Sequence, residues 1–202
     1  MSSLNALAAA PNAHPPFAAA ARGARGRAAK RVLLVNRVAH MGGVERVILT
    51  LAGGLRRQGY DALLACPGSG DLPDAARAAG VMVLPCGFDR MRITANPLHL
   101  LGYPSAWLKG ASDVERHCRE QGVDILHTHH PVGTLYASRA SRRLALPLVQ
   151  HVHEVPPARL AYAAALRFAG GACDRFLCVS GAGRALLEGA GIDRGRADIV
   201  HN

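Results

Sequence analysis

The sequence predicts an α/β fold built around a doubly wound, mainly parallel sheet. Two observations support this prediction: short apolar runs alternate with segments of helical periodicity at least five times, and most of the runs lack a polar face. Uniformly apolar runs are typical of strands that are buried on both sides, and strands that alternate with helices form βαβ units. We therefore expect a Rossmann-like domain that binds ligands beyond the carboxyl ends of its strands.

The expected elements begin at Arg31, where longer apolar side chains first appear. Residues 32–35 form the first apolar run, and apolar side chains three or four residues apart then predict a helix over 44–59. The other expected strands cover residues 62–66, 81–84, 123–127, 148–153, 176–179 and 199–200. The other expected helices cover residues 72–79, 111–121, 133–144, 158–169 and 180–188. Residues 86–110 have no clear periodicity, and Gly102 and Pro104 are expected to bend or break any helix there.

Residues 1–30 are rich in alanine, proline and arginine, with Phe17 as the only large aromatic side chain. Such a segment buries too little apolar surface to offset the entropy that is lost when it becomes ordered. We therefore expect a disordered tail, followed by one folded domain over residues 31–202. The arginines of the tail leave open an alternative, which is loose contact with anionic lipid headgroups.

The net charge of +10 does not predict a nucleic-acid partner. Residues 1–44 carry six Lys or Arg and no acid, so most of the excess charge lies in or beside the tail. No apolar stretch approaches the ~20 residues of a membrane-spanning helix. Five cysteines at irregular spacing are a poor disulfide framework. We expect a cytoplasmic protein, with peripheral contact at the inner face of the membrane left open.

A pair of glycines, Gly42 and Gly43, follows the first expected strand and precedes the first helix. Paired glycines at such a turn let the backbone approach a ligand closely, and the free N–H groups of the helix favour an anion. A tight turn without a ligand is the alternative. The pair is neither the complete glycine fingerprint of dinucleotide-binding domains nor a phosphate-binding loop with its Lys-Ser/Thr.

Five of the ten histidines follow two expected strands: His127, His129 and His130 after one, and His151 and His153 at the end of the next. His-x-His pairs bind zinc in many proteins. The sequence nevertheless predicts no metal site, because residues two apart share a face only while a strand continues, and no third cluster of ligands is evident. We expect neutral histidines that hydrogen-bond hydroxyls and phosphates at the rim of a cleft, with purely structural histidines as the alternative.

Several of these segments together resemble the N-terminal half of family 4 glycosyltransferases, which have the GT-B fold. The motif Gly-Gly-Val-Glu-Arg at the start of the first helix resembles the beginning of that family. The stretch Asp-Ile-Leu-His-Thr-His-His-Pro over 124–131 is similar to its D-hydrophobic-hydrophobic-H-x-H segment. Three further segments match in order, namely 147–153 with its final histidine, Cys-Val-Ser at 178–180, and Ile-Val-His-Asn at 199–202.

The resemblance implies one half of a two-domain enzyme. In this family the N-terminal half binds the acceptor, and the C-terminal half binds the nucleotide sugar through two glutamates seven residues apart. The chain reaches Asn202 where the linker to the donor half would begin. We therefore expect the donor domain to be absent, the chain to be inactive by itself, and a separate donor-binding domain to be a partner.

The family transfers a sugar from a nucleotide diphosphate to an acceptor hydroxyl, with retention and without a metal ion. The resemblance implies that His153 is catalytic, facing the donor sugar. His127 and His129 would shape the acceptor pocket, and Gly42 and Gly43 would approach the diphosphate or the acceptor. Arg46 would contact an anionic acceptor, or be an ordinary surface arginine. No cofactor is expected, since the nucleotide sugar is a substrate and the acceptor is a glycan or a lipid-linked sugar.

The main alternative is a non-catalytic Rossmann-like module that binds a glycan or a partner protein. An NAD-dependent epimerase or dehydrogenase is disfavoured, because the complete glycine fingerprint is missing and none of the four tyrosines is followed by a lysine four residues later. A donor half encoded next to this chain would favour the transferase over the module.

Overall fold

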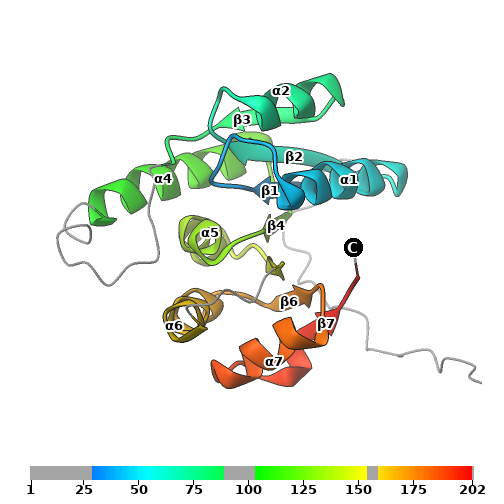
Figure 1. Cartoon of the computed structure of the whole chain (residues 1–202). Coiled ribbons are helices and arrows are strands. Elements are labelled where there is room, and N and C mark those ends of the chain that lie inside the picture. The colour runs from blue at the N-terminus through cyan, green and yellow to red at the C-terminus, as the bar shows by residue number, and fades with distance from the viewer. Residues whose placement is uncertain (1–28, 89–102, 154–158, 202) are drawn as a thin grey trace, which may run out of the picture.

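The computed structural model describes residues 29–88, 103–153 and 159–201. These residues form a seven-stranded sheet in which all neighbouring strands are parallel, in the order β3-β2-β1-β4-β5-β6-β7 (Figure 1). The strands are β1 (Arg31–Val35), β2 (Asp61–Cys66), β3 (Met82–Pro85), β4 (Ile125–Thr128), β5 (Leu148–Val152), β6 (Arg175–Cys178) and β7 (Ala197–Ile199). The chain starts in the middle of the sheet and winds outward in both directions, which confirms the predicted doubly wound fold.

Helices cover both faces of this sheet. Among the described residues they are α1 (Gly43–Arg57), α2 (Asp71–Ala78), α4 (Tyr103–Gln121), α5 (Pro131–Leu144), α6 (Arg159–Gly170) and α7 (Gly181–Gly189), with one 3₁₀ turn η1 (Arg194–Arg196). In the view of Figure 1, α4, α5 and α6 run down the left side of the molecule and α1 lies on the right. Within the described ranges, every helix is too short or too polar to cross a lipid bilayer.

The two faces of the sheet carry two separate apolar cores. On one face, Leu34 of β1 belongs to a cluster with Ile48 of α1 and Leu72 of α2. On the other face, Leu33 belongs to a larger cluster with side chains from α4 to α7. Because successive strand residues point to opposite faces, one apolar run supplies both cores, which explains why the strands lack a polar face.

Helix α4 begins at residue 103, eight residues before the predicted start at 111. Pro104 does not break this helix because it lies in the first turn, where its missing N–H has no partner to lose. Gly110 lies inside the helix and packs against α5, since a Cβ on this glycine would lie 2.7 Å from the ring of Tyr136. Pro104 therefore marks the start of the helix and not a break, and Gly102, the other expected break, lies outside the described residues.

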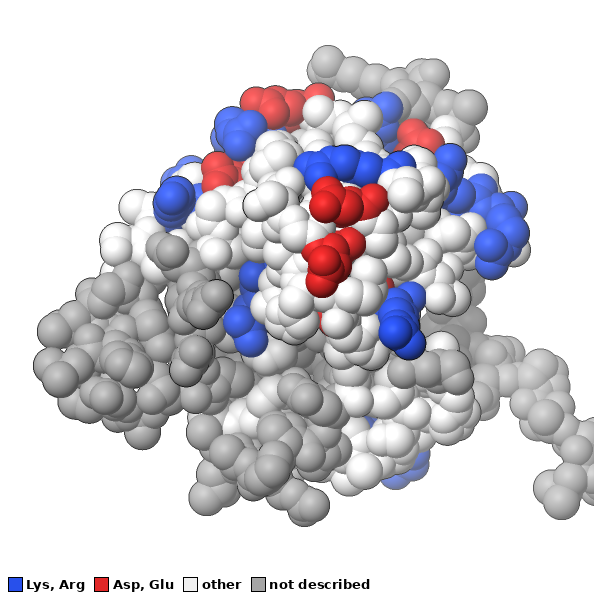
Figure 2. Space-filling view, turned by 45° about the horizontal axis from the view of Figure 1, so that its top comes forward, with Lys and Arg blue, Asp and Glu red and all other residues white. Residues whose placement is uncertain are grey.

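The other expected elements agree with the structure to within a few residues. The last strand is β7, which ends one residue before the predicted end at 200. The predicted tail, apart from its last two residues, and the segment 89–102 lie outside the described residues. On the face that Figure 2 shows, basic and acidic side chains lie interspersed and do not form a uniform basic patch.

Candidate functional site

The loop after β1 is held in place by a buried hydrogen bond between Asn36 and Glu45. The Asn36 side-chain amide donates to Glu45 Oε1 over 3.1 Å and to the Val38 carbonyl over 3.2 Å. Both Asn36 and Glu45 are buried, and the Asn36 backbone N–H also donates to Ala65 at the end of β2. The first turn of α1 is thereby fixed to the end of the first strand, although sequence reasoning did not single out Asn36.

Gly42 and Gly43 lie between this loop and α1, and they have different neighbours. A Cβ at Gly42 would lie 2.8 Å from Glu45 Oε2, whereas nothing lies within 4 Å of a Cβ at Gly43. Gly42 has an extended backbone, which any residue can adopt. A glycine fits this position because the Glu45 carboxylate occupies the space that a Cβ would take. Gly43 is exposed, is the first residue of α1 and lines the cleft described below. The backbone N–H groups in the first turn of this helix have no partner within the helix.

Four histidines from β4, β5 and the residues that follow them form one cluster. In the register of the two parallel strands, Thr128 pairs with Gln150, which places His129 beside His151. The rings of His127 and His129 are stacked, with centroids 4.7 Å apart and an interplanar angle of 4°. The rings of His151 and His153 lie 4.1 Å apart. All four side chains therefore lie on the same side of the sheet.

The cluster is buried, and burial controls its protonation. The residues His127, His129 and His151 are 6%, 3% and 5% exposed, and His153 is half-buried. Burial, reinforced by the neighbouring histidines, lowers the pKa of His127 to about 3, that of His153 to about 4, and that of His129 well below its usual value. All three imidazoles are therefore neutral at pH 7, and each has one N–H donor and one acceptor nitrogen.

A cleft of about 290 Å³ opens at the carboxyl ends of β1, β4 and β5. It brings together four of the six predicted site residues: Gly42, Gly43, His129 and His153. His127 does not line it, because this residue lies buried against His129. Arg46 is exposed on α1 and also lies outside the lining. The binding of substrate by these residues stays a prediction.

The cleft is also lined by His130, one of the five histidines expected at a cleft rim, and by Tyr162, which the sequence analysis did not single out. His130 Nδ1 accepts a hydrogen bond from the backbone N–H of Val132 over 3.1 Å and caps α5. Burial and the charge of Arg37 lower the pKa of His130 to about 4, which keeps the capping nitrogen an acceptor at pH 7. His130 is therefore a structural histidine, and Pro131 behind it was the available signal for a helix start.

A buried polar network on the other face of the sheet fixes β4, β5 and α5 to one another. Thr134 of α5 lies 2.7 Å from the Thr128 hydroxyl and donates to Gln150 Oε1 over 3.0 Å. Because these residues alternate with the histidines along both strands, the network holds the strand ends that carry the cluster.

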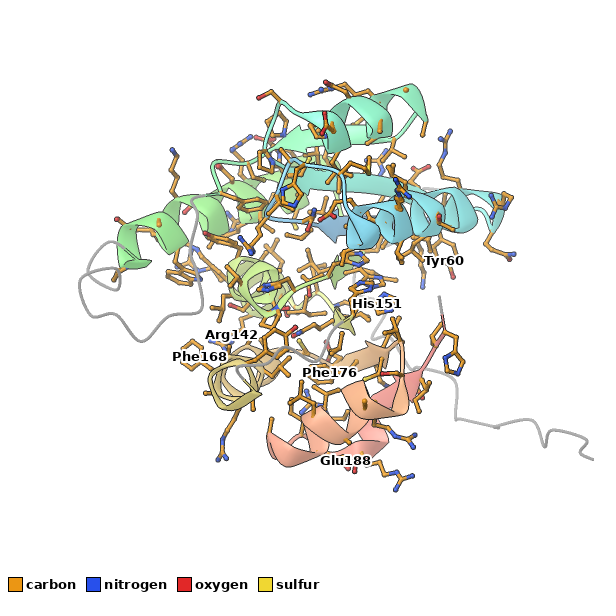
Figure 3. All side chains as sticks on the ribbon, in the orientation of Figure 1. Tyr60, Arg142, His151, Phe168, Phe176 and Glu188 are labelled. Carbon is orange, nitrogen blue, oxygen red and sulfur yellow. The ribbon has the colours of Figure 1, made fainter. Side chains whose placement is uncertain are left out.

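Three members of the cluster could hold a metal ion. One ring nitrogen from each of His127, His129 and His151 lies within 4.8 Å of the other two. The two reasons for expecting no metal therefore do not hold in the structure: the first histidine pair shares a face, and His151 supplies a third nitrogen. In the view of Figure 3, His151 lies between α1 above and β6 below.

Comparison with known proteins gives one family and a set of solved structures. The model of glycosyltransferase family 4 matches residues 41–202. No curated protein matches the chain. Among solved structures, HepE from Anabaena in complex with UDP and glucose is 16% identical, with a TM-score of 0.64 over 85% of this chain and 44% of its own.

Two further structures match to a similar extent. A glycosyltransferase from Rickettsia africae is 18% identical, with a TM-score of 0.61 over 87% of this chain and 44% of its own. The apo form of WaaB, a lipopolysaccharide outer core galactosyltransferase, is 17% identical, with a TM-score of 0.62 over 86% of this chain and 45% of its own. The chain thus spans less than half the length of each of these proteins.

Proposed function

This chain belongs to glycosyltransferase family 4, and from this membership we propose that it forms the acceptor-binding half of a retaining glycosyltransferase of the GT-B fold. The proposed reaction moves a sugar from a nucleotide diphosphate to an acceptor hydroxyl without a metal ion at the diphosphate. The observation that carries the proposal is the cleft at the carboxyl edge of the sheet, where Gly43, His129 and His153 meet. In doubly wound sheets this edge is where ligands bind.

In the proposed reaction the bond between the anomeric carbon and the diphosphate oxygen breaks, and the electron pair leaves with the diphosphate. The acceptor oxygen forms the new bond on the same face of the sugar, and its proton passes to the departing diphosphate. The difficulty of such a step is the charge that develops on the leaving group, which fixed hydrogen-bond donors stabilise. Donors that are already oriented in the enzyme need no reorganisation during the reaction.

We assign His153 to the donor sugar. Its Nε2 lies 3.0 Å from His129 Nδ1, and both rings are neutral at pH 7. A neutral His153 can donate a hydrogen bond to a sugar hydroxyl without adding a charge to the site. Glu45 also belongs to the cleft lining, but it is buried and its carboxylate accepts a hydrogen bond from Asn36.

The donor and the acceptor are proposed by class. HepE was solved with UDP and glucose, and WaaB is a galactosyltransferase that acts on a lipopolysaccharide core. By analogy, we propose a nucleotide sugar as the donor and a glycan or lipid-linked sugar as the acceptor. A lipid-linked acceptor would place the protein in the cytoplasm at the inner face of the membrane. A separate donor-binding domain would complete the enzyme.

The test is to reconstitute the enzyme from two halves. The coding sequence after codon 202 is searched for a donor half with the two-glutamate motif, and this chain is expressed together with it or with the donor half of a family relative. Release of nucleoside diphosphate is measured with UDP-, GDP- and ADP-sugars in the presence of glycan and lipid extracts. We expect turnover with both halves together and none with either half alone.

Two outcomes contradict the proposal. Turnover of a nucleotide sugar by the isolated 202-residue chain would show that no separate donor half is needed. Binding of a glycan by the chain, with no turnover in any pairing, would instead support a non-catalytic glycan-binding module.

A further inference from the structure

The histidine cluster contains buried nitrogen atoms that have no hydrogen-bond partner. Among the described residues, these include Nε2 of His127, Nε2 of His129 and both ring nitrogens of His151. Buried polar atoms in folded proteins are nearly always paired with protein, water or an ion. Four unpaired nitrogens on three adjacent rings therefore leave hydrogen-bonding or coordination capacity for a further species between them, either a water molecule or an ion.

We propose that His127, His129 and His151 bind one divalent transition metal ion, and that the ion is Zn²⁺. This site differs from the diphosphate site of the proposed reaction, because all three ligands are nitrogens and only His129 also lines the cleft. The proposal concerns these residues alone and needs no assumption about the sugar.

The distances between the three nitrogens allow them to bind one ion if the rings turn toward it. Three atoms no more than 4.8 Å apart all lie within about 2.8 Å of a common centre, and Zn–N bonds are about 2.0–2.1 Å long. Each nitrogen would therefore move inward by less than about 1 Å, and because the rings of His127 and His129 are stacked at an interplanar angle of 4°, one of the two must also turn to direct its lone pair at the ion. Three histidines leave a fourth tetrahedral position for a water molecule.

The chemistry of the ligands selects the class of metal. Imidazole nitrogen suits Zn²⁺, Cu²⁺ and Ni²⁺, whereas Mg²⁺ and Ca²⁺ require oxygen ligands. No carboxylate belongs to the ligand group found among the described residues.

The contact between His129 and His153 fits such a site. A histidine that binds a metal through Nε2 carries its proton on Nδ1 and commonly donates it to a second residue. His129 Nδ1 lies 3.0 Å from His153 Nε2, so a bound ion would make His129 the donor and leave the remaining proton of His153 on Nδ1. The value of this tautomer for sugar transfer rests on the proposed function, whereas the metal site does not.

The experiment uses the whole chain, purified without a histidine tag and freed of metal by a chelator. It measures bound zinc by elemental analysis, visible absorption after Co²⁺ addition, and the melting temperature with and without Zn²⁺. We expect one equivalent of zinc and the d–d absorption of four-coordinate Co²⁺. At about 100 times its dissociation constant, Zn²⁺ should raise the melting temperature by about 5–10 °C.

Three variants separate this cluster from adventitious binding. His127→Gln and His151→Gln each remove one ligand and should abolish the Co²⁺ absorption and the zinc-dependent rise in melting temperature. His117→Gln is the matched control, since this buried histidine on α4 lies outside the cluster and should keep both signals. If the His151 variant does not fold, the comparison of the His127 variant with the His117 control still decides the matter.

The proposal fails if the metal-free chain takes up no Zn²⁺ or Co²⁺, or if uptake survives in both cluster variants. These measurements require no sugar transfer, so their failure is distinct from the failure of the proposed function. A chain that binds zinc but gives no active transferase would support the proposed metal site and contradict the proposed function.

Discussion

His129 Nδ1 lies 3.0 Å from His153 Nε2, and this contact joins the residues that follow β4 and β5. Since both rings are neutral, one nitrogen must donate and the other must accept, so the protonation of one ring determines that of the other. His129 is buried beside a half-buried His153 that lines the cleft. The orientation of the half-buried His153 ring is therefore coupled to that of the more deeply buried His129.

The first prediction compares Gly42→Ala with Gly43→Ala. A methyl group at Gly42 would meet Glu45 Oε2 at 2.8 Å and push the carboxylate from its hydrogen bond with Asn36. Leaving a buried carboxylate short of a partner should reduce the free energy of unfolding by about 1–3 kcal/mol. Gly43→Ala has open space in the first turn of α1, so it should be neutral or stabilise the fold by up to about 1 kcal/mol. Equal losses in urea unfolding of the two variants would contradict this explanation.

The second prediction concerns Glu115 of α4, whose side chain is 3% exposed. Its carboxylate accepts a hydrogen bond from Arg139 Nε over 2.6 Å and pairs with Arg119 at 2.6 Å and Arg143 at 3.5 Å. Glu115→Gln should lower the free energy of unfolding by about 1.5–3 kcal/mol, because charged hydrogen bonds are lost. Glu120→Gln is the control on the same helix: its ion pair is half exposed, so the change should be below about 1 kcal/mol. Comparable losses in the two variants would count against a structural role for the buried cluster.

The third prediction follows from the pKa of Glu115. Burial alone would raise this pKa, but the hydrogen bond from Arg139 and the charges of the neighbouring arginines outweigh burial and lower it below 4.5. The carboxylate therefore contributes its full stabilisation above about pH 4.5, and the contribution is lost as the pH falls through the lower folded-state pKa. The stability of Glu115→Gln should depend less on pH than that of the parent below pH 4.5. Parallel pH profiles from denaturant unfolding would contradict the assignment.

The fourth prediction is that the cysteines do not react in the folded protein. All five thiols are free and buried, and burial raises the pKa of Cys66, Cys118 and Cys173 to about 12 and that of Cys178 to about 11. At pH 8 a thiol of pKa 11 is ionised to about one part in a thousand, and only the thiolate reacts. Ellman's reagent should detect no thiol at pH 8 until a denaturant is added, and five afterwards. Rapid labelling of the folded chain would reveal an exposed, activated cysteine.

The sequence predicts the sheet well because strand and helix periodicities are local properties. The apolar run at 32–35 is the clearest case, because its alternate side chains belong to the two cores. Such a strand can be predicted without knowing its register with the neighbouring strands. The start of α4 was missed because proline is both a helix breaker and a first-turn residue, and Pro104 lies in the first turn. The packing of Gly110 against Tyr136 joins residues far apart in the chain and leaves no local pattern.

The candidate site could likewise be predicted only where local patterns in the sequence determine it. The positions of Gly42, Gly43, His129 and His153 follow from strand order, because parallel strands end at the same edge. The role of His151 depends on the register between β4 and β5, and register is set by packing that the sequence does not display. The pairing of Asn36 with Glu45 likewise depends on the path of the loop between them.

The last prediction concerns His153→Ala in the reconstituted two-domain enzyme. The β5 strand ends at Val152, so His153 is the first residue beyond it and lines the cleft where we propose that sugar is transferred. A hydrogen bond that strengthens in the transition state lowers the barrier, and the loss of one such oriented donor typically reduces the rate about 10²–10³-fold. We therefore expect a loss of this size in turnover, measured per folded protein, with little change in melting temperature.

His117→Ala is the matched control for this variant. His117 is buried and its Nε2 lies 2.9 Å from the Pro85 carbonyl oxygen, but it lies on α4, away from the cleft lining. Its loss should lower the melting temperature while the folded fraction keeps its turnover. A purely structural His153 would behave in the same way as His117. A rate for His153→Ala within threefold of the parent, with unchanged acceptor affinity, would remove His153 from the site and leave the Gly42–Gly43 turn as the remaining candidate for substrate contact.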